Sequence, residues 1–211
     1  EEWHTTEAMC RISDLLHQRG LRDKAILFWN ANNTMSFNRI DWGRLNFTTR
    51  ITTVSRYMKH IMWGMGLNPL VIPNGIPKRL LEPVDGDKVQ QLRQCLSIDG
   101  GTVLTKVARW DPDKRWNMAV ESVARLKQRG LRTVLLARGG LEPHGVEVLG
   151  RARMLGLTVC EACTSDNNLN SYFQALHDSC QADVIDIKFH LPQDFLRIAY
   201  RASDAVLANS G

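Results

Sequence analysis

The chain has 211 residues, of which 44% are hydrophobic and 23% are charged, and its formal net charge at pH 7 is +5. These values are ordinary for a folded globular protein, and they exclude disordered, collagen-like and coiled-coil chains. The length is enough for one large core or two modest ones. The positive charge favours anionic partners such as phosphates, nucleic acids or acidic lipids, but ranks them only weakly.

Neither a membrane span nor a secreted disulfide framework is visible in the sequence. No stretch approaches the roughly 20 consecutive apolar residues of a membrane span, and the first residues lack the layout of a signal peptide. The five cysteines are odd in number and scattered, which indicates reduced thiols. We therefore expect a cytoplasmic protein, with room for peripheral contact at the inner face of the membrane. Cys160 and Cys163 form a C-x-x-C pair without a second pair, which favours packing over a zinc or redox site.

One sequence pattern recurs along the chain: an amphipathic run, then Gly-Leu, then a short aliphatic run. Glycine accepts the left-handed conformation that closes a helix, so each pair predicts the end of a helix before a strand. The pairs are Gly20-Leu21, Gly66-Leu67, Gly130-Leu131 and Gly156-Leu157. The pattern predicts alternating helices and strands.

In chain order, the predicted helices span 6–19, 55–65, 87–96, 116–129, 146–155, 169–179 and 193–201. The predicted strands span 25–29, 51–54, 70–72, 102–108, 133–137, 158–160, 183–187 and 204–208. Most of these strands are continuous apolar runs, as in parallel sheets that are covered by helices on both faces. The sequence therefore predicts doubly wound α/β sheets.

A break in this alternation divides the chain. The Pro-Asn-Gly-Ile-Pro segment over 73–77 favours a turn, and the next clear strand begins only near residue 102. We expect residues 1–75 to form one Rossmann-like unit, residues 76–100 to form a hinge and a linker helix, and residues 101–211 to form a second Rossmann-like unit.

The candidate chemistry lies between the first strand and the first helix of the second unit. Ligands of open α/β sheets bind beyond the carboxyl ends of the strands, where a helix N-terminus favours an anion. Arg109 supplies a rigid guanidinium and Lys114 a mobile ammonium, so one diphosphate can bridge them. The alternatives are that both are solvated surface cations, or that Arg109 pairs with Asp111 or Asp113.

Several segments resemble a known family in their order and spacing. They are Thr-Val-Ser-Arg-Tyr-Met-Lys over 53–59, Val-Ile-Pro-Asn-Gly-Ile over 71–76, the stretch over 109–114, and Ala-Ser-Asp-Ala-Val-Leu-Ala-Asn-Ser over 202–210. Together they resemble the family 4 glycosyltransferases, which have the GT-B fold. Trp-His-Thr over 3–5 is similar to a segment of the glycogen and starch synthase relatives. The resemblance runs through nearly the whole chain.

The resemblance implies two Rossmann-like parallel-sheet domains that face a cleft, each incomplete in this chain. Residues 1–75 would be the C-terminal part of the acceptor-side domain, and residues 101–211 a C-terminally truncated donor domain that binds the nucleotide sugar. A complete relative would begin about a hundred residues earlier and continue past Ser210 into a Glu-x7-Glu segment. We therefore expect the missing segments of the same enzyme as partners and little transferase activity from the chain alone.

The implied reaction is retaining transfer of a hexose, glucose or mannose, to an acceptor hydroxyl on a sugar, a glycan or a lipid-linked glycan. The donor would be UDP- or GDP-linked, and neither a metal nor another cofactor is expected. Arg109 and Lys114 would hold the donor diphosphate and stabilise charge on the leaving group. His4 would lie near the transferred sugar. The alternative for His4 is a polar residue ahead of a helix capped by Thr5 or Thr6.

The resemblance also implies donor contacts elsewhere. The loop with Phe189, His190 and Leu191 would meet the nucleotide base, largely through backbone groups, although Phe189 is equally suited to the core and His190 to the surface. The remaining implied contacts are Gly139, Gly140, Asn209 and Ser210. Two adjacent glycines more often mark a tight turn than a phosphate cradle, and the missing dinucleotide fingerprint argues against an NAD enzyme.

Two other classes of function stay open. One is a non-enzymatic, basic α/β module that binds nucleic acid or nucleotides. Because aromatic residues do not alternate with the basic ones in a stacking pattern, we expect no nucleic acid partner. The other is an epimerase or hydrolase that acts on nucleotide sugars and shares this architecture.

Overall fold

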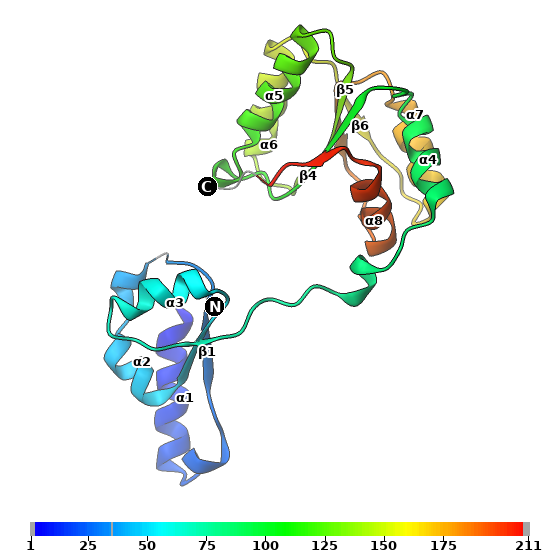
Figure 1. The fold of residues 1–211 in the computed structure, drawn as a ribbon. Helices are drawn as coiled ribbons and strands as arrows, with labels where there is room; N and C mark the ends of the chain where they lie inside the picture. Colours follow the sequence, from blue (N-terminus) through cyan, green and yellow to red (C-terminus); the bar gives the residue numbers. More distant parts are fainter. Residues whose placement is uncertain (1–2, 35, 209–211) are drawn as a thin grey trace. The chain divides into compact units, whose positions relative to one another are not determined.

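The structure is a computed structural model that describes residues 3–34 and 36–208. It divides into two compact units, Glu1–Ile76 and Pro77–Gly211, and each is described by itself (Figure 1). Within the described ranges, none of the helices combines the length and the apolar character that crossing a bilayer requires.

The first unit is a parallel sheet of three strands in the order β1-β2-β3, formed by Phe28–Ala31, Arg50–Thr53 and Leu70–Val71. Its helices are α1 (Thr5–Gln18), α2 (Trp42–Thr48) and α3 (Arg56–Trp63), with short 3-10 turns at Arg22–Lys24 and Phe37–Arg39. Residues of all three helices share one core with the inner face of the sheet, including Cys10, Leu45, Met62 and Trp29. The helices therefore cover the same face.

The opposite face of this sheet carries two exposed apolar side chains, Phe28 and Leu70, beside polar ones. Neighbours in register share a face, so the pairs Phe28–Arg50 and Thr52–Leu70 place these side chains together. Phe28 is 56% exposed and Leu70 is 61% exposed. Parallel sheets are normally covered on both faces; the helices of this unit cover only one.

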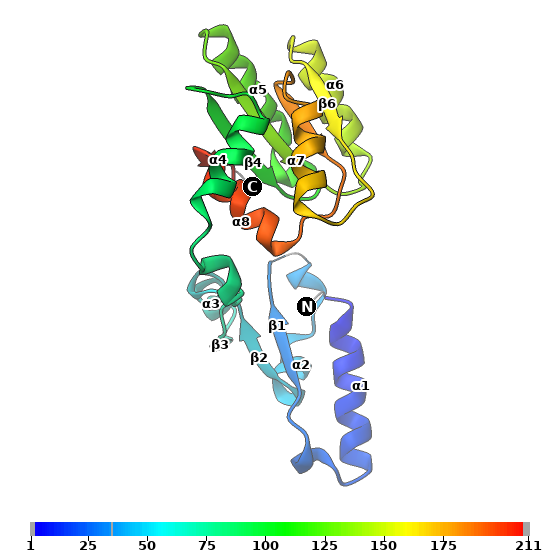
Figure 2. The same cartoon turned by 90° about the vertical axis from the view of Figure 1, so that its right-hand side faces the viewer.

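The second unit is a parallel sheet of five strands in the order β6-β7-β5-β4-β8. The strands are β4 (Thr102–Val107), β5 (Thr133–Arg138), β6 (Val159–Ala162), β7 (Val184–Ile187) and β8 (Ala205–Val206). Helices α5 (Trp116–Gln128) and α6 (His144–Met154) lie on one face of the sheet. Helices α4 (Gly86–Cys95), α7 (Leu169–Asp178) and α8 (Gln193–Ala202) lie on the other, which Figure 2 shows from the front. The prediction of a doubly wound parallel sheet is confirmed for this unit.

The four Gly-Leu pairs end helices as predicted. Gly20, Gly66, Gly130 and Gly156 have φ angles from 67° to 78°, which side chains other than glycine rarely adopt. At each one, the following leucine amide donates a hydrogen bond of 2.8 to 3.1 Å to the carbonyl five residues earlier. This is the Schellman arrangement, which satisfies carbonyls that the helix end leaves without partners.

The helix that the sequence analysis assigned to a linker packs within the second unit. Leu92 of α4 and the adjoining Leu96 are fully buried in the core that α7 and α8 share. The short 3-10 turn Lys78–Leu81 is held by Arg79, which forms a paired hydrogen bond with the Asp194 carboxylate. The two units accordingly divide between Ile76 and Pro77.

Asp204 fixes the last strand of the second unit. Its Oδ2 accepts the Val103 amide at 2.7 Å and the Arg93 guanidinium at 3.1 Å. The Val103 hydrogen bond, and then Arg93, hold the pKa of the Asp204 carboxyl below its ordinary value. Arg93 also donates to the Ala202 and Gly101 carbonyls, at 2.8 and 2.9 Å. One carboxylate thus connects α4, β4 and the start of β8.

We expect Asp204→Asn to lower the free energy of unfolding at pH 7 by about 1 kcal/mol, a discounted value for a charge-assisted hydrogen bond because the side chain is 48% exposed. Because the pKa of Asp204 is lower in the folded protein than in the unfolded one, its carboxylate stabilises the fold at pH values above the unfolded pKa of about 3.9. This stabilisation is lost as the pH falls through the folded pKa. Urea unfolding of both proteins at several pH values from 7 to 3 should show the difference shrink. Asp99→Asn, at an exposed position, is the control; equal losses in the two variants would contradict the prediction.

Candidate functional site

The loop that carries Arg109 has a well-held backbone. It follows β4 and leads into α5, at the carboxyl edge of the sheet. The Ala108 amide donates to the Arg138 carbonyl at 3.0 Å, and the Trp116 indole N–H donates to the Arg109 carbonyl at 2.7 Å. The Trp110 amide donates to Glu142 Oε2 at 3.0 Å. Three neighbouring segments therefore fix where Arg109 lies.

The Arg109 side chain is 69% exposed, and its Nη2 lies 3.8 Å from Asp111 Oδ2. An ion pair this long, formed by a largely exposed guanidinium, contributes little, so the guanidinium stays accessible to an anion. Asp111 also accepts the Asp113 amide at 2.9 Å and so caps the 3-10 turn Pro112–Lys114. The pairing with Asp111 considered above is present in this weak form.

Lys114 ends that 3-10 turn and is half-buried. The next residue, Arg115, has a left-handed backbone with φ 48°, and α5 begins immediately after it. The structure thus places Arg109 and Lys114 on one loop at the carboxyl end of a parallel strand, where ligands of open α/β sheets bind. That the two cations bind one diphosphate together stays a prediction.

Two charged residues are buried within the described part of the chain, Lys106 and Asp186, each 1% exposed. Lys106 Nζ donates to the Leu207 carbonyl at 3.3 Å and lies 5.1 Å from the centroid of the Trp116 ring. Burial, and then the nearby charge of Lys114, lower the pKa of Lys106. The sequence analysis missed Lys106; its signal was a lysine inside the apolar strand Thr102–Val107.

Asp186 lies near the carboxyl end of β7 and pairs with Lys188, whose Nζ is 2.6 Å from Asp186 Oδ2. Glu161 Oε1 is 3.7 Å from the same ammonium. Burial of Lys188 lowers its pKa, but hydrogen bonding and attraction to Asp186 outweigh burial, so the pKa is raised. Lys188, which directly precedes Phe189 in the loop predicted to meet the nucleotide base, is therefore held at the carboxyl edge of the sheet.

The Phe189 side chain is a core residue, as the alternative above describes, while a contact of its backbone with a nucleotide base stays a prediction. It is 4% exposed, stacks on Tyr172 with centroids 4.6 Å apart, and meets Phe195 edge to face at 5.6 Å. This aromatic packing withdraws the ring from any ligand. His190 is exposed and Leu191 is half-buried, and their contact with a base stays a prediction.

Gly139 and Gly140 leave room for neighbouring side chains. A Cβ on Gly139 would lie 2.0 Å from Trp110 Nε1, and one on Gly140 would lie 2.3 Å from Glu142 Oε2. A Cβ on Gly145 would also come within 2.7 Å of the Trp110 ring. Packing around Trp110 therefore requires a glycine at 139, while a nucleotide contact at this turn stays a prediction.

His4 belongs to the first unit. His4 is exposed, directly precedes α1 in the first unit, and its ring meets the Trp3 ring edge to face at 6.0 Å. Neither Thr5 nor Thr6 is the N-cap, because α1 begins at Thr5; Thr6 instead donates its hydroxyl to the Trp3 carbonyl at 2.6 Å. The role of His4 beside a sugar stays a prediction. Asn209 and Ser210 lie outside the described residues.

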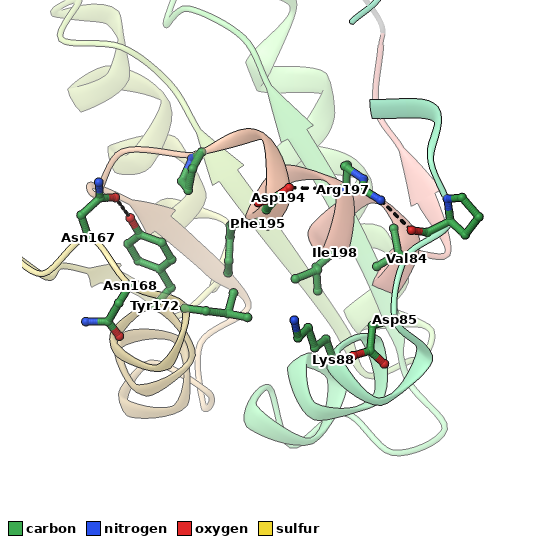
Figure 3. A pocket seen from close by; sticks show the side chains of 13 residues that line it. Val84, Asp85, Lys88, Asn167, Asn168, Tyr172, Asp194, Phe195, Arg197 and Ile198 are labelled. Carbon is green, nitrogen blue, oxygen red and sulfur yellow. Dashed lines mark hydrogen bonds and ion pairs between the residues drawn. The ribbon is translucent and has the colours of Figure 1, made fainter. Parts of the chain in front are cut away.

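A separate pocket of about 530 Å³ lies between the first turns of α4, α7 and α8. Lys88, Asn167, Tyr172, Asp194 and Arg197 are among its lining residues (Figure 3). Arg197 pairs with Asp194 and donates to the Pro83 carbonyl at 2.6 Å, and the Tyr172 hydroxyl donates to Asn167. The pocket contains neither of the predicted diphosphate cations.

The cysteines and carboxylates do not form a metal cluster in the described part of the chain. No group of three or more His, Cys, Asp or Glu side chains there is close enough to hold an ion. Cys160 and Cys163 are free thiols.

No protein-family model matches the sequence, and no curated protein matches it. The structure is similar to solved structures of HepE (Alr3699) from Anabaena. In complex with UDP-glucose, that protein matches with a TM-score of 0.62 at 14% identity, over 96% of this chain and 50% of that one. In complex with UDP, the values are 0.64, 15%, 98% and 51%; with UDP and glucose, they are 0.59, 13%, 92% and 50%.

The chain thus spans about half the length of the solved structures that it matches. At this identity the likeness shows the fold: an α/β chain with parallel, Rossmann-like sheets that corresponds to half of a GT-B glycosyltransferase. The similarity to HepE, which was solved in complex with UDP-glucose, is distant.

We expect Gly139→Ala to destabilise the second unit by about 2 kcal/mol, because the new methyl group would displace the buried Trp110 ring. The matched control is Gly150→Ala in α6, where a Cβ has no neighbour within 4 Å and alanine favours the helix. Urea unfolding followed by circular dichroism measures both. A Gly139→Ala protein as stable as the control would contradict this packing role.

Proposed function

We propose that this chain supplies the donor-binding part of a retaining hexosyltransferase that uses a UDP-sugar. The observation that carries the proposal is an exposed guanidinium on a fixed loop: Arg109 is 69% exposed, while its backbone carbonyl is held by Trp116 at 2.7 Å. An anion-binding group that is fixed in place but open to solvent is suited to a charged ligand. Lys114 follows on the same loop.

The comparisons support the choice of ligand. The similar structures of HepE contain UDP-glucose, UDP, or UDP and glucose. In this proposal, the uridine diphosphate lies at the carboxyl edge of the second unit's sheet, with its phosphates at Arg109 and Lys114. Glucose is the favoured hexose, and a glycan or lipid-linked sugar hydroxyl is the acceptor.

The proposed chemistry needs charge stabilisation above all. The bond between the anomeric carbon and the diphosphate oxygen breaks, a new bond to the acceptor oxygen forms, and negative charge develops on the diphosphate. Arg109 and Lys114 would stabilise that charge. The leaving diphosphate itself can accept the proton of the acceptor hydroxyl, so the paired carboxyl groups of glycoside hydrolases are not required. His4 and the loop at His190 are further candidates for donor contacts.

Titration with UDP tests the donor site directly. We expect UDP to raise the melting temperature, since a ligand at 100 times its Kd adds about 2.7 kcal/mol to the stability of the state that binds it. Arg109→Ala should weaken UDP binding roughly tenfold or more, because it removes a charge-assisted contact. Isothermal titration calorimetry measures both affinities.

The control is Arg125→Ala, which removes an exposed arginine from α5 of the same unit and should leave UDP affinity unchanged. If Arg109→Ala and Arg125→Ala bind UDP equally well, the diphosphate is not held by this loop and the proposal fails. Absence of UDP binding by the unmodified chain would also overturn it.

A further inference from the structure

Lys106 is not explained by the stability of the core in which it lies. Its side chain is 1% exposed within strand β4. Burial of an ammonium group is costly, and a hydrophobic side chain of similar size would fill the same space without that cost. A role outside packing therefore accounts better for a lysine at this position.

The contacts of Lys106 join two segments that surround the Arg109 loop. Its Nζ donates to the carbonyl of Leu207 at 3.3 Å, directly after β8. The Leu207 amide in turn donates to the Thr105 carbonyl at 2.8 Å. On the other side, Nζ lies 5.1 Å from the centroid of the Trp116 ring, within the range of a cation–π interaction.

Trp116 connects Lys106 to the backbone of Arg109. The ring is fully buried at the start of α5, and its indole N–H is the donor that holds the Arg109 carbonyl at 2.7 Å. Trp110, the residue after Arg109, packs against the same ring with centroids 4.1 Å apart. The orientation of the Trp116 ring therefore sets the backbone from which the guanidinium extends.

Lys106 also adds charge beneath the loop. The ammonium of Lys114 is close enough to oppose the charge of Lys106, which lowers the pKa of Lys106 after burial has already done so. A dianionic phosphate group at the loop would reverse the sign of that local interaction. Buried charges act through a lower dielectric than exposed ones, so this contribution is felt at the loop surface.

We propose that Lys106 is a positioning residue of the nucleotide-diphosphate site, which acts through the Trp116 ring and the Leu207 carbonyl to hold Arg109 in its binding position. This inference rests on the proposed function of Arg109. Lys106 itself is too deeply buried to contact the nucleotide.

The test compares UDP with uridine, which lacks the phosphates, in Lys106→Met. We expect the Kd for UDP to rise about tenfold, comparable with the loss of one charge-assisted contact, while the affinity for uridine stays unchanged. A purely structural role predicts a lower melting temperature with no selective loss of UDP binding, and that result would overturn the inference.

Two further variants make the outcome decisive. Trp116→Phe keeps an aromatic ring but removes the donor to the Arg109 carbonyl, so it should show the same selective loss of UDP binding; it decides the question if Lys106→Met does not fold. Lys78→Met removes an equal charge from an exposed position of the same unit and should bind UDP normally. If Arg109→Ala weakens UDP binding but Lys106→Met and Trp116→Phe do not, this inference alone is wrong. If Arg109→Ala has no effect either, the proposed function is wrong as well.

Discussion

The pairing of β4 with β5 organises the second unit. Six consecutive residues of each strand lie in parallel register, from Thr102 with Thr133 to Val107 with Arg138. Because parallel strands end at the same edge, the two loops that follow them leave the sheet side by side. Trp110 from one loop then packs on Gly139 of the other. The register of β4 and β5 thus places the two loops of the candidate site side by side, whatever side chains the loops carry.

Unfavourable local features gather around this loop. Lys106 is buried, Arg115 has a left-handed backbone without being glycine, and Gly139 leaves no space for a Cβ beside Trp110. The first two oppose folding when considered alone, and the third restricts the position to glycine. Sites at which sequences depart from local rules are often those that carry a function, and the three departures here flank the residue that we assign to the phosphates.

The alternation of helices and strands could be predicted because its signals are local. A Gly-Leu pair needs only its own φ angle and one hydrogen bond to end a helix, and an apolar run needs only its own residues to indicate a strand. Helix α2 escaped prediction because it has seven residues and starts from the Asp41 cap without a glycine at its end. The packing of α4 within the second unit could not be predicted, because its few apolar positions, such as Leu92, are buried by helices far along the chain.

The site was less predictable because its contacts are not local in the sequence. The sequence indicates cations at 109 and 114, but not that Trp116 reaches back to the Arg109 carbonyl or that Lys106 lies against that ring. These contacts depend on side-chain directions that only tertiary packing sets. Phe189 shows the converse: one aromatic residue in a loop fits either a ligand or a core, and Tyr172 and Phe195 decide for the core.

The uncovered face of the first unit has a practical consequence for solution work. Phe28 and Leu70 stand on a preformed, pleated surface, and hiding such a surface from water yields roughly 25 cal/mol for each Å². Two molecules can bury this surface against each other, and by mass action the associated fraction grows with protein concentration. Dilution series are therefore the means of separating the intrinsic behaviour of one molecule from that of its aggregates.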